Sequence, residues 1–346
     1  MELQTDIIAP TGDFFLRISA STPPSNPVFW AAANRSWIEE QLMKFGVLLL
    51  RGFGVNPEQF GDVVSALSPP RSRLEYVGGI VPRSKLRDGV YTTTAFPNHA
   101  KLVQHQEMAY YRWWPQKLYF YCEIACEQGG ETPVSSVRHF GARLDPKVFA
   151  RFREKKVMYT RNYVSENDPS AHPAVPTWQK AYDTSERTEV EAFCRKNSIE
   201  CSWSPRGGLR TRQVSQGVTQ HAKSGEDVWF NQVSSINMYS GSPNFVAPSL
   251  RSLHLPKAEL VRISSMTPDE LPYSALYGDG TPIEHSVQDE VAGLFEQGEI
   301  IEPWQTGDVM IVDNLLAAHG RNPFSGQRRI VVSLTEPGGD VQNCPW

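Results

Sequence analysis

The sequence has few cysteines, little net charge and no long apolar run. Its 346 residues include 5 cysteines, an odd number with no Cys-x-x-Cys pair, which indicates neither a disulfide framework nor a zinc site. The formal net charge of −4 offers no basic surface for nucleic acid or an anionic membrane. The N-terminus lacks a signal-peptide pattern, and no apolar run is long enough to span a bilayer. We therefore expect a cytoplasmic protein with reduced thiols that binds neither nucleic acid nor membrane.

Internal repeats and a Gly-rich phosphate-binding loop are also missing from the chain. The composition is that of an ordinary globular protein, with 40% hydrophobic and 21% charged residues, and it can bury a sizeable core. The length fits two average domains or one large one. We predict a single domain over residues 1–346.

Helix signals occur at four places. Asn56-Pro57 and Asp145-Pro146 each put a capping residue and a proline before an apolar stripe of helical period. Residues 183–197 and 286–297 are two further amphipathic segments, and Gly298 closes the second. The predicted strands are 47–51, 118–124, 157–163, 228–232, 300–304, 309–314 and 329–335.

The spacing of these strands indicates the fold class. They are scattered along the chain with long, uneven connections, which argues against a Rossmann sheet and against a propeller. The pattern fits an α+β protein whose core is a double-stranded β-helix, the jelly roll of cupin-like proteins, with helices packed outside. Residues 165–256, rich in proline, serine and polar side chains, then form an insertion, and long connections of this kind often cover a binding site.

Three residues form a predicted metal site. On an extended strand, residues i and i+2 share a face, so His105 and Glu107 can reach one ion. His319 follows the apolar strand 309–314 and can supply a second imidazole. Two histidines and one carboxylate on one side of a metal leave coordination positions open, as in non-haem Fe(II) oxygenases. An isolated His-x-Glu triplet is more often structural, so the prediction depends on the surrounding sequence.

Several segments together resemble a known enzyme family. They are 45–53 (FGVLLLRGF), 105–110 (HQEMAY), 129–136 (GGETPVSS), 224–232 (SGEDVWFNQ) and 319–329 (HGRNPFSGQRR). In this order they resemble the Fe(II)/2-oxoglutarate dioxygenases of the taurine dioxygenase and clavaminate synthase type. Within that superfamily the chain looks most like the syringomycin-pathway hydroxylase group. The chain departs from the usual sequence motifs of the group at Gln106 and Ser136. Neither residue is a predicted metal ligand.

The resemblance implies Fe(II), 2-oxoglutarate and O₂ as cofactor and co-substrates. It places the far carboxylate of 2-oxoglutarate on Arg329 and Thr132, and the fork of a guanidinium suits such a carboxylate. Neighbouring strand residues face opposite ways, so Arg328 is expected outside the barrel in a surface or structural ion pair. The alternative for Thr132 is a turn hydroxyl bonded to local backbone. Arg321 could contact substrate or hold the turn, and we favour the structural role.

Two further positions bear on the reaction. Halogenases of this superfamily replace the carboxylate ligand with a small residue, whereas this chain keeps Glu107, so hydroxylation or another oxygen-driven C–H reaction is implied. The arginine that binds the sulfonate in taurine dioxygenase, four residues after its 2-oxoglutarate arginine, falls here on Ser333. Taurine is therefore not the expected substrate.

Substrate contacts are assigned to Arg83 and Asn231. A substrate with a carboxylate or amide would be fixed by an arginine and a polar amide, because only a fixed pose presents one C–H bond to the metal. The competing interpretation is that both residues only hold loops against the barrel.

The function that these residues and the resemblance imply is hydroxylation of an amino acid or aminoacyl compound in specialised metabolism. The small-molecule substrate could be presented by a carrier protein. The same iron chemistry could instead serve desaturation, epoxidation or cyclisation. The chain could also be a jelly-roll binding protein without turnover. The sequence does not indicate the oligomeric state.

Overall fold

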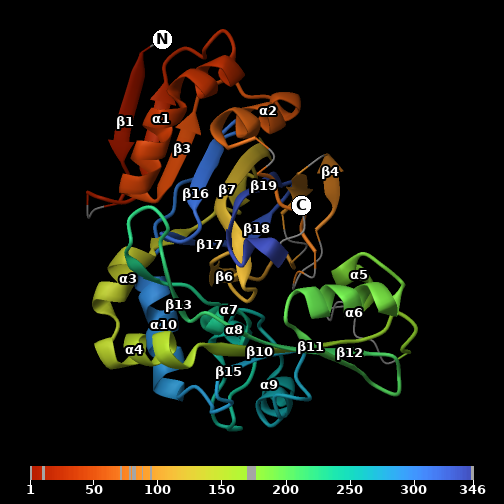
Figure 1. The fold of residues 1–346 in the computed structure, drawn as a ribbon. Helices are drawn as coiled ribbons and strands as arrows, with labels where there is room; N and C mark the ends of the chain where they lie inside the picture. Colours follow the sequence, from red (N-terminus) through yellow and green to blue (C-terminus); the bar gives the residue numbers. More distant parts are fainter. Residues whose placement is uncertain are drawn as a thin grey trace.

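The protein is built from β-sheets flanked by helices. The structure is a computed structural model that describes residues 2–9, 12–70, 72–77, 79, 83–87, 89–93, 96–169 and 177–343. Figure 1 shows the N-terminal elements at one end, the elements from the middle of the chain at the other, and β6, β7 and β17 between them. Within these ranges, none of the helices has the length and apolar character of a membrane span.

The largest sheet has eight strands and combines distant parts of the chain. β16 lies antiparallel between β3 and β7, and β19 pairs with β7 along most of its length. In spatial order the strands are β1 (Leu3–Ile7), β2 (Leu16–Ala20), β3 (Val47–Arg51), β16 (Val309–Asp313), β7 (Trp113–Ile124), β19 (Arg329–Gly339), β5 (Val90–Thr92) and β4 (Lys85–Arg87).

Both faces of this sheet are buried, which explains its apolar strands. Tyr119 and Tyr121 of β7 pack with the cluster beneath the helices α1 (Pro27–Phe45) and α2 (Pro57–Leu67). The alternate residues Leu118 and Phe120 belong to the larger core on the other face. As predicted, Asn56 caps α2, in a capping box that satisfies the first turn of the helix.

A smaller sheet faces the main one and closes the jelly roll. It contains β6 (Leu102–His105), β17 (Ala317–Arg321) and β9 (Val134–Ser136), while β8 (Gln128–Gly129) and β18 (Phe324–Ser325) form a separate two-stranded pair. The expected jelly-roll architecture is confirmed. Outside lie α3 (Val137–Arg143), α4 (Pro146–Lys155) and α10 (His285–Gln297).

The middle of the chain forms a second layered unit. Its four-stranded sheet runs β11 (Glu200–Trp203), β12 (Leu209–Ser215), β10 (Val157–Tyr163) and β15 (Tyr273–Tyr277). The same part of the chain also contains the hairpin of β13 (Val218–Gln220) and β14 (Asp227–Trp229), and the helices α5 (Trp178–Tyr182), α6 (Arg187–Lys196), α7 (Val233–Ile236), α8 (Pro248–Arg251) and α9 (Lys257–Ser264). The short helix η1 (Val341–Asn343) follows β19 near the C-terminus. The four-stranded sheet is shared with strands outside 165–256. Whether that segment acts as a cover stays a prediction.

Most predicted elements are present, with two corrections. The segment 300–304 is not a strand, because Ile300 makes only one bridge, to Val134, and Pro303 has no N–H to donate. The strand predicted at 228–232 ends at Trp229. Of the cysteines, Cys344 lies outside the described residues, and the other four are free thiols.

Candidate metal centre

β6 and β17 bring the two predicted histidine ligands together. His105, the last residue of β6, is paired directly with His319 of β17. Their imidazole rings lie 4.5 Å apart between centroids. Glu107 is not on the strand as expected, because β6 ends at His105 and the carboxylate comes from the turn that follows. That turn directs Glu107 toward both histidines.

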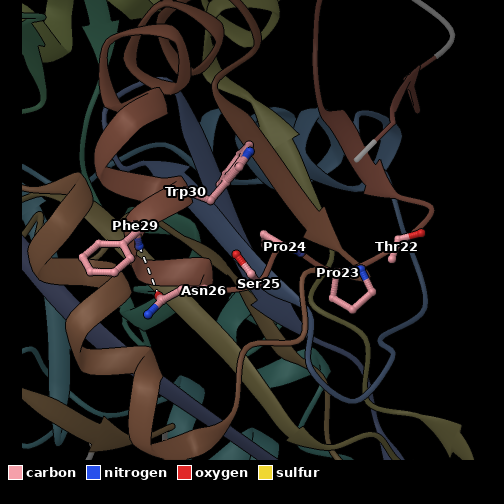
Figure 2. Close-up of a pocket in the computed structure, with 7 residues that line it drawn as sticks. All are labelled: Thr22, Pro23, Pro24, Ser25, Asn26, Phe29 and Trp30. Atoms are coloured by element: carbon pink, nitrogen blue, oxygen red, sulfur yellow. Dashed lines mark hydrogen bonds between the residues drawn. The ribbon is translucent and has the colours of Figure 1, made fainter.

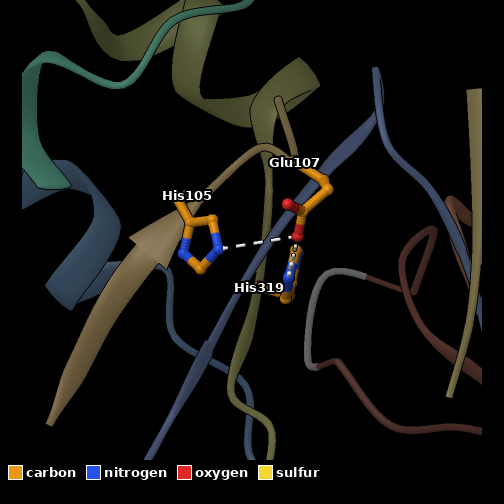
Figure 3. A group of neighbouring side chains, drawn as sticks. All are labelled: His105, Glu107 and His319. Atoms are coloured by element: carbon orange, nitrogen blue, oxygen red, sulfur yellow. Dashed lines mark ion pairs between the residues drawn. The ribbon is translucent and has the colours of Figure 1, made fainter. Parts of the chain in front are cut away.

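The three side chains converge on one point (Figure 3). Glu107 Oε2 lies 3.9 Å from His105 Nε2 and 3.8 Å from His319 Nε2. Ligand atoms at right angles on an ion with bonds of about 2.1 Å would be roughly 3 Å apart, so a contraction of less than about 1 Å suffices to hold a metal. The residues present therefore fit a divalent ion.

The electrostatics also suit metal binding. Burial lowers the pKa of His105, and it lowers the pKa of His319 well below its ordinary value. Both rings are thereby kept neutral, the form that offers a lone pair. His105 Nδ1 donates a hydrogen bond to Val103 O at 2.9 Å, which leaves Nε2 as the free donor atom facing Glu107.

Glu107 is held on both its backbone and its side chain. Asn314 accepts a hydrogen bond from the Glu107 N–H at 2.7 Å and donates to the Glu107 carbonyl at 2.9 Å and to that of Pro115 at 2.8 Å. On the carboxylate, Arg83 Nη2 lies 2.6 Å from Oε2. Sequence reasoning missed Asn314, since nothing in the sequence shows that the turn after β16 meets the turn after β6.

A cavity adjoins the triad, and two of the four residues predicted to bind 2-oxoglutarate or substrate line it. Thr132 and Arg83 line it beside the two histidines. Thr132 Oγ1 accepts a hydrogen bond from Trp304 Nε1 at 3.1 Å, so its own proton is available for a ligand. The remaining lining residues are Thr93, Leu102, Phe120, Gly320, Arg321 and Arg328.

The structure reverses the predicted orientation of the paired arginines. Arg329 is 52% exposed and forms an ion pair with Glu123 at 2.6 Å, outside the cavity. Arg328 lines the cavity and donates from Nε to Gly130 O at 2.7 Å. The reason lies in β19: Ile330 packs into the larger core on the cavity side, so its neighbour Arg329 faces outward. The prediction that Arg329 points into the barrel is wrong.

Arg328 has the environment of an anion-binding residue. Among the described residues, no carboxylate forms an ion pair with it. Burial, with the nearby charge of Arg321, lowers the pKa of Arg328 to about 10. A guanidinium in such a place gains when an anion enters. The sequence alone does not distinguish Arg328 from Arg329 here, because residues 330–334 are buried on both faces of the strand.

Two other predicted residues have structural positions. Asn231 is buried away from the cavity, where its side chain donates to Gly217 O at 2.8 Å and accepts from Val233 N at 3.1 Å. The substrate role predicted for Asn231 is therefore not supported by its location. Arg321 touches the cavity, but its guanidinium donates to the carbonyls of Phe96, at 2.8 Å, and Ala100, at 2.8 Å. These bonds hold the loop before β6.

A second hollow lies far along the chain from the triad, at the start of α1 (Figure 2). It is lined by residues 22–26 together with Phe29 and Trp30. None of these side chains titrates or binds metal ions, and Asn26 is occupied as the cap of α1. The chemistry of the protein is therefore located at the triad.

Known proteins provide the remaining comparison. Residues 13–335 match the family model for taurine catabolism dioxygenase TauD, TfdA family. The chain is 35% identical over 301 residues to dapdiamide synthesis protein DdaC of Enterobacter agglomerans, covering 87% of this chain and 85% of that protein. It is 29% identical over 305 residues to a clavaminate synthase-like protein of Arabidopsis thaliana, with 87% and 84% covered.

A solved structure agrees in fold. PvcB of Pseudomonas aeruginosa, described as an Fe, alpha-ketoglutarate dependent oxygenase from an isonitrile synthetic pathway, has a TM-score of 0.50 and 15% identity, over 96% of this chain and 91% of that chain. With the family model spanning nearly the whole chain and a His-Glu-His centre beside a cationic cavity, this protein belongs to the TauD/TfdA family of Fe(II)- and 2-oxoglutarate-dependent dioxygenases.

Proposed function

We propose that this dioxygenase hydroxylates an amino acid or an aminoacyl compound in the biosynthesis of a specialised metabolite. The observation that carries the proposal is the cavity that the two histidines of the triad line together with Arg328 and Thr132. DdaC is named for dapdiamide synthesis, and PvcB is described as part of an isonitrile synthetic pathway. Both names support a biosynthetic setting. Closeness to the syringomycin-type group and presentation by a carrier protein stay part of this proposal.

Each residue has a distinct task in the proposed reaction. His105, Glu107 and His319 hold the iron, which supplies the activation of O₂ and the oxidation of a C–H bond when 2-oxoglutarate is bound. Arg328 binds the far carboxylate of 2-oxoglutarate through its guanidinium, and Thr132 adds a hydroxyl donor. Counted from Arg328, the position that would bind a sulfonate is Val332, an apolar residue, so taurine still does not fit.

The wall of the cavity limits access of water to the metal. Phe120 packs against His319 with ring centroids 5.1 Å apart, and the histidines are largely covered. Glu107 fills the position that a halogenase would leave for chloride, which favours oxygen transfer. Desaturation, epoxidation and cyclisation need the same residues, and product analysis separates them from hydroxylation.

A pair of arginine variants tests the assignment of the 2-oxoglutarate site. Loss of one partner of a buried charge-assisted pair costs about 2–5 kcal/mol, so Arg328→Met should raise the Kd of N-oxalylglycine, an inert 2-oxoglutarate analogue, roughly 30-fold or more. Arg329→Met is the matched control and should change this Kd less than about threefold. Calorimetric titration of the Mn(II)-loaded protein gives both values, and the opposite ranking would return the role to Arg329.

A panel of candidate substrates identifies the substrate class. Free amino acids, acylated amino acids and carrier-bound aminoacyl thioesters are incubated with Fe(II), 2-oxoglutarate and O₂, and succinate formation is measured with product mass. A substrate without a C=C bond that gains one oxygen atom for each succinate formed supports hydroxylation, whereas an oxygen atom gained at a C=C bond also fits epoxidation. Absence of any 2-oxoglutarate turnover with intact metal binding would instead support a binding protein.

A further inference from the structure

Arg83 presents unused hydrogen-bond donors directly beside the metal ligands. Its side chain is only 4% exposed, and Nη2 is occupied by Glu107 at 2.6 Å. The atoms Nε and Nη1 are buried and have no hydrogen-bond partner within the described ranges. Each buried donor left unsatisfied costs about 1–3 kcal/mol, and more when the group is charged. A ligand in the cavity that Arg83 lines would satisfy them.

Arg83 is also fixed in place on an aromatic ring. Its guanidinium lies 4.6 Å from the ring centroid of Tyr76. The same tyrosine interacts electrostatically with Glu107 and with Tyr110, three residues further along the turn. Arg83 therefore cannot swing away to solvent, and its free donors keep a constant direction relative to the metal.

A buried layer of tyrosines and one arginine lies beyond Tyr76. The hydroxyl of Tyr110 interacts with that of Tyr76, whereas the buried hydroxyl of Tyr163 makes no hydrogen bond with another described residue. Arg161, 2% exposed, stacks 5.1 Å from the ring centroid of Tyr110 and 4.9 Å from that of Tyr111. Burial raises the pKa of Tyr110 and Tyr163, so their hydroxyls keep their protons. The layer is thus cationic and rich in donors.

The charge of the whole site favours an anionic substrate. Glu107 is the acidic side chain of the triad and would be neutralised by the iron that it binds. Arg83, Arg161 and Arg328 contribute positive charge, and dianionic 2-oxoglutarate offsets only part of the total from these residues and the ion. Buried positive charge of this kind is stabilised by a ligand of opposite charge.

We propose that Arg83 binds a free carboxylate of the substrate through Nε and Nη1. This inference rests on the proposed function and names its substrate class, a carboxylic acid oxidised close to its carboxylate. The closeness follows from the geometry, because Arg83 contacts the metal ligand Glu107 itself, which leaves room for only a few bonds between carboxylate and reacting carbon. An α- or β-carbon is the expected position.

The test compares acids with their neutral amides. Protein loaded with Co(II) and N-oxalylglycine is titrated with acetate, with N-acetyl amino acids and with the amide of each, and the Co(II) absorption band and the heat of binding are recorded. The expected result is that at least one acid binds tenfold or more tightly than its amide. Arg83→Gln should abolish this preference, while Co(II) and N-oxalylglycine still bind.

Two further variants keep the result interpretable. Arg87→Gln, on the neighbouring exposed strand β4, is the matched control and should leave the preference unchanged. Arg83→Lys keeps the charge beside Glu107 and should retain Co(II) binding with part of the preference, even if Arg83→Gln fails to fold.

Each other outcome has a defined meaning. Equal binding of acids and amides to protein that holds Co(II) and N-oxalylglycine overturns the carboxylate site and leaves the proposed function standing. If the Arg83 variants weaken N-oxalylglycine or Co(II) and leave the acid preference, Arg83 serves the keto acid or Glu107, and the inference is wrong. Failure of the native protein to bind Co(II) or N-oxalylglycine overturns the proposed function itself.

Discussion

Glu107 combines two interactions that pull on the same oxygen. Its Oε2 atom is the one nearest both histidines and also the one paired with Arg83. A carboxylate oxygen has more than one lone pair, so it can coordinate a cation and accept from a guanidinium together. At the scale of single residues, the arginine therefore keeps the carboxylate aligned before any metal arrives.

Metal-dependent stability tests the three ligands. Saturating Mn(II) should raise the melting temperature of the protein by a few degrees, because a ligand at about 100 times its Kd stabilises the fold by about 2.7 kcal/mol. His319→Ala should lose this increase, since two protein ligands remain. The control His139→Ala removes a half-exposed histidine that pairs with Asp13, and it should keep the increase. An unchanged response of His319→Ala would exclude His319 as a ligand.

The pKa and the exposure of each thiol predict which cysteines react with an alkylating reagent. Burial raises the pKa of Cys122 and that of Cys194 to about 12, whereas Cys126 and Cys201 are partly exposed. The thiolate is the reactive form, and at pH 8 a pKa of about 12 leaves roughly one part in 10⁴ ionised. Brief alkylation of native protein, mapped by mass spectrometry, should label Cys126 and Cys201 and spare the other two until denaturant is added. Early labelling of Cys122 would contradict its burial.

The metal ligands were predictable from the sequence, because metal binding restricts the residue types that can hold the ion. His105, Glu107 and His319 are recognisable because few sequences combine these side chains with the surrounding motifs, and the structure brings the three together. The choice between Arg328 and Arg329 depends on strand parity, and an apolar strand buried on both faces gives no parity signal. Asn231 resembled a ligand-binding amide, but its hydrogen bonds to backbone are invisible in a sequence.

At the scale of elements, the two turns that follow β6 and β16 are locked together. Asn314, at the end of β16, makes three side-chain hydrogen bonds to the backbone around the metal turn, two of them to Glu107. Such a connection positions a ligand through its main chain, which leaves the carboxylate free to bind. The sequence analysis predicted the strand before Asn314, but it did not predict the hydrogen bonds from Asn314 to the turn that carries Glu107.

Asn314 variants should measure what its side-chain hydrogen bonds contribute to stability and metal binding. Asn314→Leu leaves the N–H and C=O of Glu107 buried without partners, which should cost about 2–6 kcal/mol of unfolding free energy. Asn314→Ser is smaller and should recover part of the loss through one hydroxyl bond. Urea denaturation of the apoprotein measures the stability, and Mn(II) titration should show weaker binding in Asn314→Leu. Unaltered stability would mean that water replaces the amide.

The boundaries of helices and strands show which of them local sequence patterns can predict. Asn56 and Asp145 were predicted as caps and cap α2 and α4 through their side chains, because a cap involves only neighbouring residues. The segment 300–304 looked like a strand, yet Glu302 forms ion pairs with Arg17 and Arg51 in place of a ladder. Contacts from distant strands decided its conformation, and no local pattern carries that information.

At the scale of the whole molecule, the main sheet interleaves early and late segments. β16 and β19 alternate with β3, β7 and β5, so neighbouring strands come from opposite parts of the chain. Pairings between distant segments slow folding, since long loops must close before any contact forms. The jelly roll could be inferred from uneven strand spacing, whereas this strand order could not.

The interior position of β19 has a consequence for how the protein is made on the ribosome. Until residues 329–339 have emerged, β7 lacks its longest neighbour and β5 has no partner on that side. A nascent chain that ends before β17 carries His105 and Glu107 but lacks His319, which pairs with His105 in the folded protein. Cellular metal ions then meet only a weak two-ligand chelate. We therefore expect the iron to bind late in synthesis, after His319 has emerged and paired with His105.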